Sequence, residues 1–245
     1  TRYSARAARI IIADSQATAR DLAECYAVPP EKIRVIYPGR DEHMRRVEDA
    51  ETLARVRAKY ALSGPYLLHV GTLQPRKNLA RLAEAFGVLL SERADPALTL
   101  ALAGRRGWLA GPILQRIAAL GLQNRVRLLE YVDEADLPAL YSGAQVFVFP
   151  SLYEGFGFPV LEALACGAPV VCSNISSLPE VAGEAARLVA PTDVAAWAAA
   201  LADLLNNPGQ RAELAARGPA QAARFSWQQC GEGTLAALRE AAGAA

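Results

Sequence analysis

The sequence predicts an α/β fold with a Rossmann-like parallel sheet and helices on both of its faces. Short apolar segments alternate with segments of helical periodicity along the whole chain, which is typical of parallel strands joined by helices. Most of the apolar segments are apolar at every position, as expected of strands buried on both faces. The 245 residues are 52% hydrophobic, which is enough to build a sizeable core.

Eight apolar segments are predicted to be strands. They are short and rich in Val, Ile and Leu, and Gly or Pro bounds several of them. The strands are expected at residues 9–13, 32–38, 65–71, 98–104, 125–132, 145–151, 168–173 and 186–190.

The segments between these strands are predicted to be helices, because apolar residues recur there at helical spacing. The helices are expected at residues 15–26, 79–91, 111–120, 134–142, 159–166, 194–205, 210–224 and 227–241. A further amphipathic helix is expected within residues 40–62, a charged segment that precedes the main alternation.

The chain is expected to divide into four segments. The first is a strand–helix–strand unit that ends at Pro38-Gly39, and we interpret it as the remnant of a preceding domain. The chain begins with Thr1 rather than methionine, so we expect it to be cut or processed from a longer protein. The segments are 1–40 (this unit), 41–62 (linker and helix), 63–226 (main domain) and 227–245 (closing helix).

Charge balance argues against nucleic-acid binding, and cysteine content argues against a structural zinc site. Lys and Arg number 26 against 25 Asp and Glu, so the chain lacks the basic excess of a nucleic-acid-binding protein. The four cysteines form no Cys-x-x-Cys pair and are accompanied by two histidines, which argues against a structural zinc site. We expect Cys166 and Cys172 to be buried free thiols in a cytoplasmic protein. No signal peptide opens the chain, and no apolar segment is long enough to span a membrane.

A basic loop follows the strand predicted at residues 65–71. It carries Arg76 and Lys77, and we expect Asn78 to cap the next helix. Ligands of open α/β sheets bind at the carboxyl ends of the strands. Two cations beside a helix N-terminus therefore predict an anion site suited to a diphosphate. The alternative is a solvated loop whose basic residues have no ligand.

A second loop, in "SLYEGFGFPVLEALACGAPVV", connects the strand predicted at 145–151 to the helix predicted at 159–166. Glu154 and Glu162 flank its glycines, which would let the backbone approach a ligand closely. The two carboxylates could be an acid and a base, metal ligands, clamps for sugar hydroxyls, or polar positions of a helix. Gly155-x-Gly157-x-x-Val160 only approximates a dinucleotide fingerprint, and the chain has no Walker A sequence.

These segments carry a resemblance to a known family. The sequences "VGTLQPRKNLARLAEAF", "LALAGRRGW" and the Glu-x7-Glu segment resemble the donor half of family 4 retaining glycosyltransferases, which are two-domain GT-B enzymes. The similarity extends over nearly the whole chain from about Arg9. The forms Pro-Arg-Lys-Asn and Ala-Gly-Arg-Arg-Gly-Trp resemble the bacterial mannosyltransferases that build O-antigen and other surface polysaccharides.

The resemblance implies three catalytic residues and a donor pocket. Arg76 and Lys77 would hold the donor diphosphate, Glu154 would contact sugar hydroxyls and Glu162 the ribose hydroxyls. Thr72 stands where the family often has an arginine, whose role Arg76 would take. The donor-binding residues implied are Gly71, Thr72, Gly104, Arg105, Val132, Gly155, Phe156, Gly157, Phe158 and Glu162.

The implied activity is transfer of a hexose with retention of configuration, mannose from GDP-mannose in the branch that the chain resembles. The resemblance implies no metal and no cofactor. It implies as partners a saccharide or lipid-linked acceptor, an acceptor domain ahead of this chain and, through that domain, the inner face of a membrane. Two alternatives stay open: a non-catalytic nucleotide-sugar-binding module of the same fold, and an unrelated α/β enzyme such as a dehydrogenase.

Four further expectations concern single residues and surfaces. His69, inside an apolar strand, is expected to be a satisfied core histidine, and Trp108 a packing residue. Glu180 is expected at a helix terminus. The helix at 227–241 resembles the family's crossover helix, so we expect exposed apolar surface on it and on the helix at 15–26.

Overall fold

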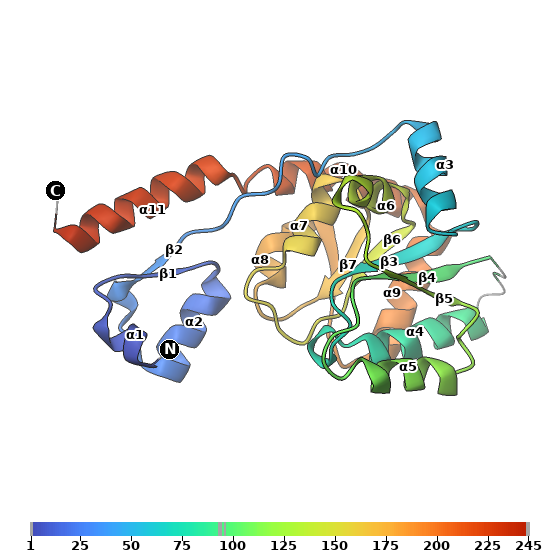
Figure 1. Ribbon diagram of the computed structural model, residues 1–245, viewed down its shortest axis with the longest axis horizontal. Coiled ribbons are helices and arrows are strands. Elements are labelled where there is room, and N and C mark those ends of the chain that lie inside the picture. The colour runs from blue at the N-terminus through green and yellow to red at the C-terminus, as the bar shows by residue number, and fades with distance from the viewer. Residues whose placement is uncertain (1, 93–94, 96, 244–245) are drawn as a thin grey trace.

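A computed structural model describes residues 2–92, 95 and 97–243 of the chain, and it confirms the predicted fold class (Figure 1). Six parallel strands form one sheet in the order β5-β4-β3-β6-β7-β8. The strands are β3 (Tyr66–Val70), β4 (Thr99–Ala103), β5 (Val126–Glu130), β6 (Val146–Phe149), β7 (Val170–Ser173) and β8 (Ala186–Val189).

The strand order reverses direction between β3 and β6. From β3 the chain proceeds through β4 to β5 on one side, and β6 then returns to the other side of β3 and leads to β7 and β8. The register pairs Leu67 with Leu100 on one neighbour and with Val146 on the other. Such a topological switch point leaves a crevice outside the carboxyl ends of the strands, where ligands of open α/β sheets bind.

Helices cover both faces of the sheet and bury two apolar clusters (Figure 1). On one face lie α4 (Leu79–Glu92), α5 (Ala110–Ala119) and α9 (Val194–Asn206). On the other lie α3 (Ala50–Lys59), α6 (Leu137–Gly143), α7 (Phe158–Ala165), α8 (Leu178–Ala182) and α10 (Pro208–Ala222). In α4 the fully buried Leu79, Leu82 and Phe86 recur at helical spacing, which explains both the helix and the face that it buries.

Residues 2–40 form a separate small unit. It contains α1 (Arg2–Ala7), β1 (Ile11–Ala13), α2 (Gln16–Tyr26) and β2 (Ile33–Val35), with β1 and β2 paired in parallel. In Figure 1 this unit lies to the left of the large sheet, and α11 (Trp227–Ala242) extends over it. An ion pair between Arg34 and Glu240 joins α11 to β2.

Within the residues that the structure describes, the sequence located the eight strands and the helices α2 to α7 and α9 to α11, but it missed α1 and α8. Both are short, six and five residues, so they offer too few positions for a helical period to be recognised. Trp108 was predicted to pack, and this is wrong: it is 76% exposed. Cys166 and Cys172 are buried as predicted. Exposed Trp227, Leu235 and Leu238 confirm apolar surface on α11, and exposed Tyr26 and Ile12 lie on and before α2.

Candidate functional site

The candidate site lies where the loops after β3 and β6 meet, at the switch point of the sheet. The loop after β3 contains a short 3-10 turn, Pro75–Lys77, which carries both predicted cations. The loop after β6 carries Glu154 and leads into α7. The hydrogen bond from the Leu152 N–H to the Arg76 carbonyl (2.8 Å) fixes the two loops to each other.

The two cations and Glu154 form one ion-paired cluster. The Lys77 Nζ donates to Glu154 Oε1 at 2.7 Å, and an Arg76 guanidinium nitrogen lies 2.6 Å from Glu154 Oε2. The same nitrogen donates to the Tyr153 carbonyl at 2.5 Å. Lys77 and Glu154 are each 7% exposed, whereas the Arg76 side chain remains 41% exposed. The cluster carries one net positive charge and presents Arg76 to solvent, so it can receive an anion.

Burial and ion pairing shift the pKa values of Lys77 and Glu154. Burial lowers the pKa of Lys77, and the hydrogen bond to Glu154 opposes that shift. Burial favours a raised pKa for Glu154, but hydrogen bonds from Lys77 and Arg76 outweigh it and hold this pKa below its ordinary value. Glu154 is therefore an ionised acceptor, which does not suit it to donate a proton. The Lys77 ammonium also lies 4.6 Å from the centre of the Phe149 ring, a cation–π contact.

Glu162 lies in a different environment, in the second turn of α7. Its Oε2 accepts a hydrogen bond from the Tyr141 hydroxyl of α6 at 2.7 Å. Burial raises the pKa of Glu162 against the effect of this bond, and the negative charges of Asp41 and Glu134 raise it further. The structure thus gives the two predicted glutamates separate partners, cations for Glu154 and a phenol for Glu162.

Two predicted glycines allow the loops after β3 and β4 to pack against each other. A Cβ on Gly104, which has φ of +147°, would lie 2.1 Å from the Gly71 carbonyl oxygen. A Cβ on Gly71, with φ of +152°, would lie 3.3 Å from His69 Nε2 and 3.7 Å from Lys77 Nζ. Side chains at either position would therefore disturb the floor of the candidate site.

The glycine loop before α7 exposes backbone rather than side chains. Gly157 has φ of +113° and directly precedes α7, with no side-chain cap. Pro159 carries no N–H, and the Val160 N–H donates to the Gly157 carbonyl at 2.9 Å, so an anion at this end of α7 could be met only by the N–H groups of Gly157 and Phe158. The Phe156 ring is buried against Tyr37 and Phe225, so this predicted residue offers only its backbone to a ligand. Phe158 is 43% exposed at the first position of α7.

The other predicted donor-binding residues border the same end of the sheet. Val132 lies two residues after β5 and is buried, and Thr72 after β3 is exposed. The guanidinium of Arg105, after β4, lies 5.4 Å from the centre of the exposed Tyr131 ring. No bond of Thr72 or Arg105 to the cation cluster is found within the described part of the chain.

Two expectations about neighbouring residues need correction. Asn78 does not cap α4 through its side chain, since its amide donates to the Pro150 (3.1 Å) and Pro191 (2.7 Å) carbonyls and so holds two loops. His69 is buried as expected and pairs through Nδ1 with the Val148 carbonyl at 3.0 Å. Its Nε2, however, has no hydrogen-bond partner among the residues that the structure describes, and burial lowers its pKa to about 4.

Sequence reasoning missed two serines and a tyrosine that shape the site. The Ser176 hydroxyl accepts from the Glu154 N–H at 3.1 Å. The buried Ser177 hydroxyl donates to the carbonyls of Glu154 (3.0 Å) and Phe156 (2.6 Å). These serines, and Tyr141 beside Glu162, come from segments distant in sequence, and no local motif marks them.

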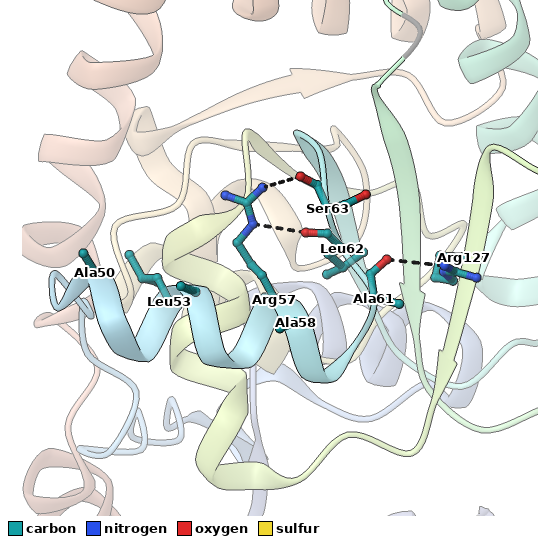
Figure 2. A pocket seen from close by; sticks show the side chains of 9 residues that line it. Ala50, Leu53, Arg57, Ala58, Ala61, Leu62, Ser63 and Arg127 are labelled. Atoms are coloured by element: carbon teal, nitrogen blue, oxygen red, sulfur yellow. Dashed lines mark hydrogen bonds between the residues drawn. The ribbon is translucent and has the colours of Figure 1, made fainter.

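A large hollow elsewhere on the molecule does not belong to this site. It has a volume of about 720 Å³ and lies along α3, and Figure 2 shows Arg57 reaching from that helix toward the Leu62 and Ser63 carbonyls. Leu62 and Ser63 precede β3, and Arg127, which also lines the hollow, stands near the start of β5. The hollow therefore opens at the amino ends of the parallel strands, opposite the candidate site.

Two further findings concern metals and membranes. Among residues 2–92, 95 and 97–243, no group of three or more His, Cys, Asp or Glu side chains is arranged to hold a metal ion. Within the same residues, no helix combines the length and the apolar character needed to cross a membrane.

Comparison with known proteins identifies the family to which this fold belongs. Residues 51–221 match the family model "Glycosyl transferases group 1", and residues 1–43 match "Glycosyltransferase Family 4". The chain is 43% identical over 182 residues to the O-antigen chain mannosyltransferase B of Escherichia coli, covering 74% of this chain and 48% of that protein. It is 34% identical over 231 residues to the MMP alpha-(1->4)-mannosyltransferase of Mycolicibacterium hassiacum, covering 93% and 53%. The chain thus spans about half the length of these two relatives.

Solved structures agree with the fold. HepE of Anabaena, crystallised with UDP and glucose, superposes with a TM-score of 0.85 at 24% identity, over 96% of this chain and 64% of that one. A glycosyltransferase of Rickettsia africae gives a TM-score of 0.85 at 21% identity, over 95% and 63%. The family model covers more than half of the residues and the structural neighbours include GT-B glycosyltransferases, so this chain belongs to the group 1 glycosyltransferases.

Proposed function

We propose that this chain binds the donor of a retaining hexosyltransferase, and that the donor is GDP-mannose. The observation that carries the proposal is the cluster of Arg76, Lys77 and Glu154 at the switch point of the sheet. It offers a net positive charge and an exposed guanidinium at the place where open α/β sheets bind nucleotides. The choice of mannose is supported by the names of the Escherichia coli and Mycolicibacterium hassiacum relatives.

Each group of the cluster has a role that its surroundings support. Arg76, which is partly exposed, would bind the diphosphate, and Lys77 would stabilise the charge that develops on it as the glycosidic bond breaks. The backbone N–H groups of Gly157 and Phe158, directly before and at the start of α7, would add to this stabilisation. Glu154 would orient both cations and accept hydrogen bonds from the sugar hydroxyls. No residue is assigned as a nucleophile, because attack by the acceptor on the same face of the sugar requires none.

Glu162 would bind the ribose on the other side of the diphosphate. Its carboxylate is oriented by Tyr141, and a carboxylate with two acceptor oxygens suits a pair of vicinal hydroxyls. The nucleobase would lie near Val132, just after the end of β5, and would contact backbone groups there.

Hydrolysis by a pair of carboxylates is less well supported. That chemistry needs one carboxylic acid that is protonated and a second carboxylate across the glycosidic bond. Glu154 is held ionised by two cations, which is the opposite of what a general acid needs. The cluster therefore favours binding of an anionic leaving group over proton donation.

The proposal extends to the division of the chain. Residues 63–226 would be the donor-binding domain, 1–40 the end of an acceptor domain, 41–62 the linker and 227–245 the crossover helix. The two family matches, to residues 1–43 and 51–221, support a boundary in the linker. The acceptor would be a saccharide or a lipid-linked saccharide of a surface polysaccharide, which the name of the Escherichia coli relative supports.

A thermal-shift screen of the chain against GDP, UDP, ADP and their sugars tests the proposal. A nucleotide at a hundred times its dissociation constant stabilises its protein by about 2.7 kcal/mol, so a clear rise in melting temperature is expected with GDP and GDP-mannose. Stabilisation by UDP and not GDP would contradict the choice of donor. No stabilisation by any of them would contradict the function itself.

A further inference from the structure

Glu180 lies in α8, outside the cation cluster, yet its carboxylate is bound to the first unit of the chain. Its Oε2 accepts from the Gln16 N–H at 2.9 Å, and its Oε1 accepts from the Ala17 N–H at 3.0 Å. These N–H groups belong to the first turn of α2 and have no acceptor within that helix. A carboxylate there is also stabilised by the helix dipole. Glu180 was expected at a helix terminus and does lie in the first turn of α8, and its carboxylate caps the N-terminus of α2.

Two neighbours complete this contact. The Tyr37 hydroxyl, after β2, donates to Glu180 Oε2 at 2.7 Å. Burial and this hydrogen bond raise the pKa of Tyr37 to about 12, so the phenol remains a donor at neutral pH. Ser15 accepts from the Thr18 N–H at 3.0 Å and so satisfies the next amide of α2. With Glu180 in place, the N-terminus of α2 is fully capped.

The segment that carries Glu180 also holds the loop at residues 153–158. Ser176 and Ser177, directly before α8, hydrogen-bond the backbone of Glu154, and Ser177 also reaches Phe156. Ser177 and Glu180 lie three residues apart, the spacing that places two positions on the same side of a helix. Residues 176–180 therefore contact the loop of Glu154 through Ser176 and Ser177, and they contact α2 through Glu180.

The same loop contacts α2 directly at two points. The Tyr153 hydroxyl donates to Asp21 Oδ2 at 2.6 Å, and the Thr18 hydroxyl donates to the Gly155 carbonyl at 3.4 Å. Both partners on α2 lie within its first two turns. A displacement of the loop would consequently act on α2 both directly and through α8.

We propose that Glu180 is a positioning residue that couples occupancy of the loop at 153–158 to the placement of residues 2–40 beside the site. This inference rests on the proposed function, because it takes that loop as the donor loop. A bound diphosphate sugar orders the loop, Ser176 and Ser177 follow it, and Glu180 transmits the change to α2. The first unit is thereby held in one orientation when the donor is present.

Amide hydrogen exchange at Gln16 and Ala17, measured by NMR on the whole chain without ligand, tests the contact itself. Glu180→Ala is expected to speed exchange at both amides at least tenfold, because they lose their acceptor. Tyr37→Phe keeps both N–H bonds and is expected to have a smaller effect. Glu184→Ala, a nearby exposed glutamate, is the matched control and should change nothing. Thermal melting of each variant confirms folding. If the alanine variant is unstable, Glu180→Gln replaces it, and because its amide keeps one acceptor oxygen, faster exchange is expected at one of the two amides.

Exchange in the presence of GDP-mannose, UDP-glucose or ADP-glucose tests the coupling. The nucleotide sugar that binds the wild-type chain should slow exchange at Gln16 and Ala17 at least threefold, and this effect should vanish in Glu180→Ala. Since coupling is reciprocal, the affinity for that nucleotide sugar should fall by the same factor. If the ligand binds and slows exchange at Gln16 and Ala17 equally in the wild-type and Glu180→Ala proteins, the coupling is overturned and the proposed function still stands. Absence of binding to the wild-type chain would overturn both, and unchanged exchange in ligand-free Glu180→Ala would overturn the contact alone.

Discussion

Two glutamates stand eight residues apart on either side of one glycine loop, yet the fold treats them in opposite ways. Glu154 lies between Arg76 and Lys77, and its pKa falls below the ordinary value although it is buried. Glu162 has one phenol as its partner, and burial raises its pKa. Glu154 is held by two ion pairs, whereas Glu162 is a buried hydrogen-bond acceptor.

The difference teaches that the spacing of acidic residues does not define their chemistry. Opposite pKa shifts can also mark a catalytic acid and base, but such a pair flanks the bond that it cleaves, whereas Glu154 and Glu162 border one strand–loop–helix turn and have separate hydrogen-bond partners. Glu154 organises the cations that would meet a diphosphate. Glu162 has no cation partner among the described residues and suits neutral hydroxyl groups.

The largest expected effect comes from removing the buried cation. Lys77→Met keeps the apolar stem but leaves Glu154 with Arg76 alone, and the loss of one partner from a buried pair costs about 3 kcal/mol of folding free energy. Nucleotide binding is expected to weaken about a hundredfold, since the charge that meets the phosphate is lost. Urea unfolding and calorimetric titration measure the two effects.

A double variant shows whether the pair itself causes this loss. Lys77→Met with Glu154→Gln removes both charges, so most of the lost stability should return while nucleotide binding stays weak. Equal stability of the single and double variants would contradict the account of an uncompensated buried carboxylate.

The second expected effect is opposite pH dependence of stability at the two glutamates. Glu154 has a lowered folded-state pKa, so its contribution is present above the reference value of 4.5 and is lost as the pH falls through the folded-state pKa. Glu162 has a raised folded-state pKa, so its contribution is present below 4.5 and is lost as the pH rises through the folded-state pKa.

Thermal melting of the glutamine variants at pH 7 and at pH 4 separates the two cases. At pH 7, Glu154→Gln should melt lower and Glu162→Gln higher than the wild type, each by about 2–4 °C, which corresponds to about 1 kcal/mol. Both differences should shrink at pH 4. Destabilisation by Glu162→Gln at pH 7 would contradict the assigned environment of Glu162.

The smallest expected effect is that of the hydroxyl group that orients Glu162. Tyr141→Phe keeps the buried ring but removes one hydrogen bond, and such a bond contributes about 1 kcal/mol. Nucleotide affinity should fall about threefold. Tyr66→Phe is the matched control, because its buried hydroxyl donates to the Leu140 carbonyl and faces no glutamate. An equal loss of affinity in both variants would point to packing rather than to the orientation of Glu162.

The sequence predicted most of the fold because its strands are apolar at nearly every position and its longer helices are amphipathic. Periodicity fails where an element is too short, as in α8 with five residues. It also says little about a helix boundary that side chains from other segments determine. Asn78 looked like a cap, but its amide holds the loops at Pro150 and Pro191, which lie far away in sequence.

The candidate site was predicted in part, for a similar physical reason. Arg76, Lys77 and Glu154 follow strands that are neighbours at the switch point, so motif and topology together place them near each other. Tyr141 and Ser177 contact Glu162 and Glu154 only through the folding of α6 and α8. Such contacts depend on how helices pack, and no local pattern in the chain encodes them.

The most direct test of the account is a calorimetric titration of Glu154→Ala and Glu162→Ala with GDP and with GDP-mannose. If Glu154 meets the sugar and Glu162 the ribose, Glu162→Ala should weaken both ligands by about tenfold. Glu154→Ala should weaken GDP-mannose by a similar factor and leave GDP within about threefold of the wild type. Equal losses for the two ligands in both variants would contradict this division between the two glutamates.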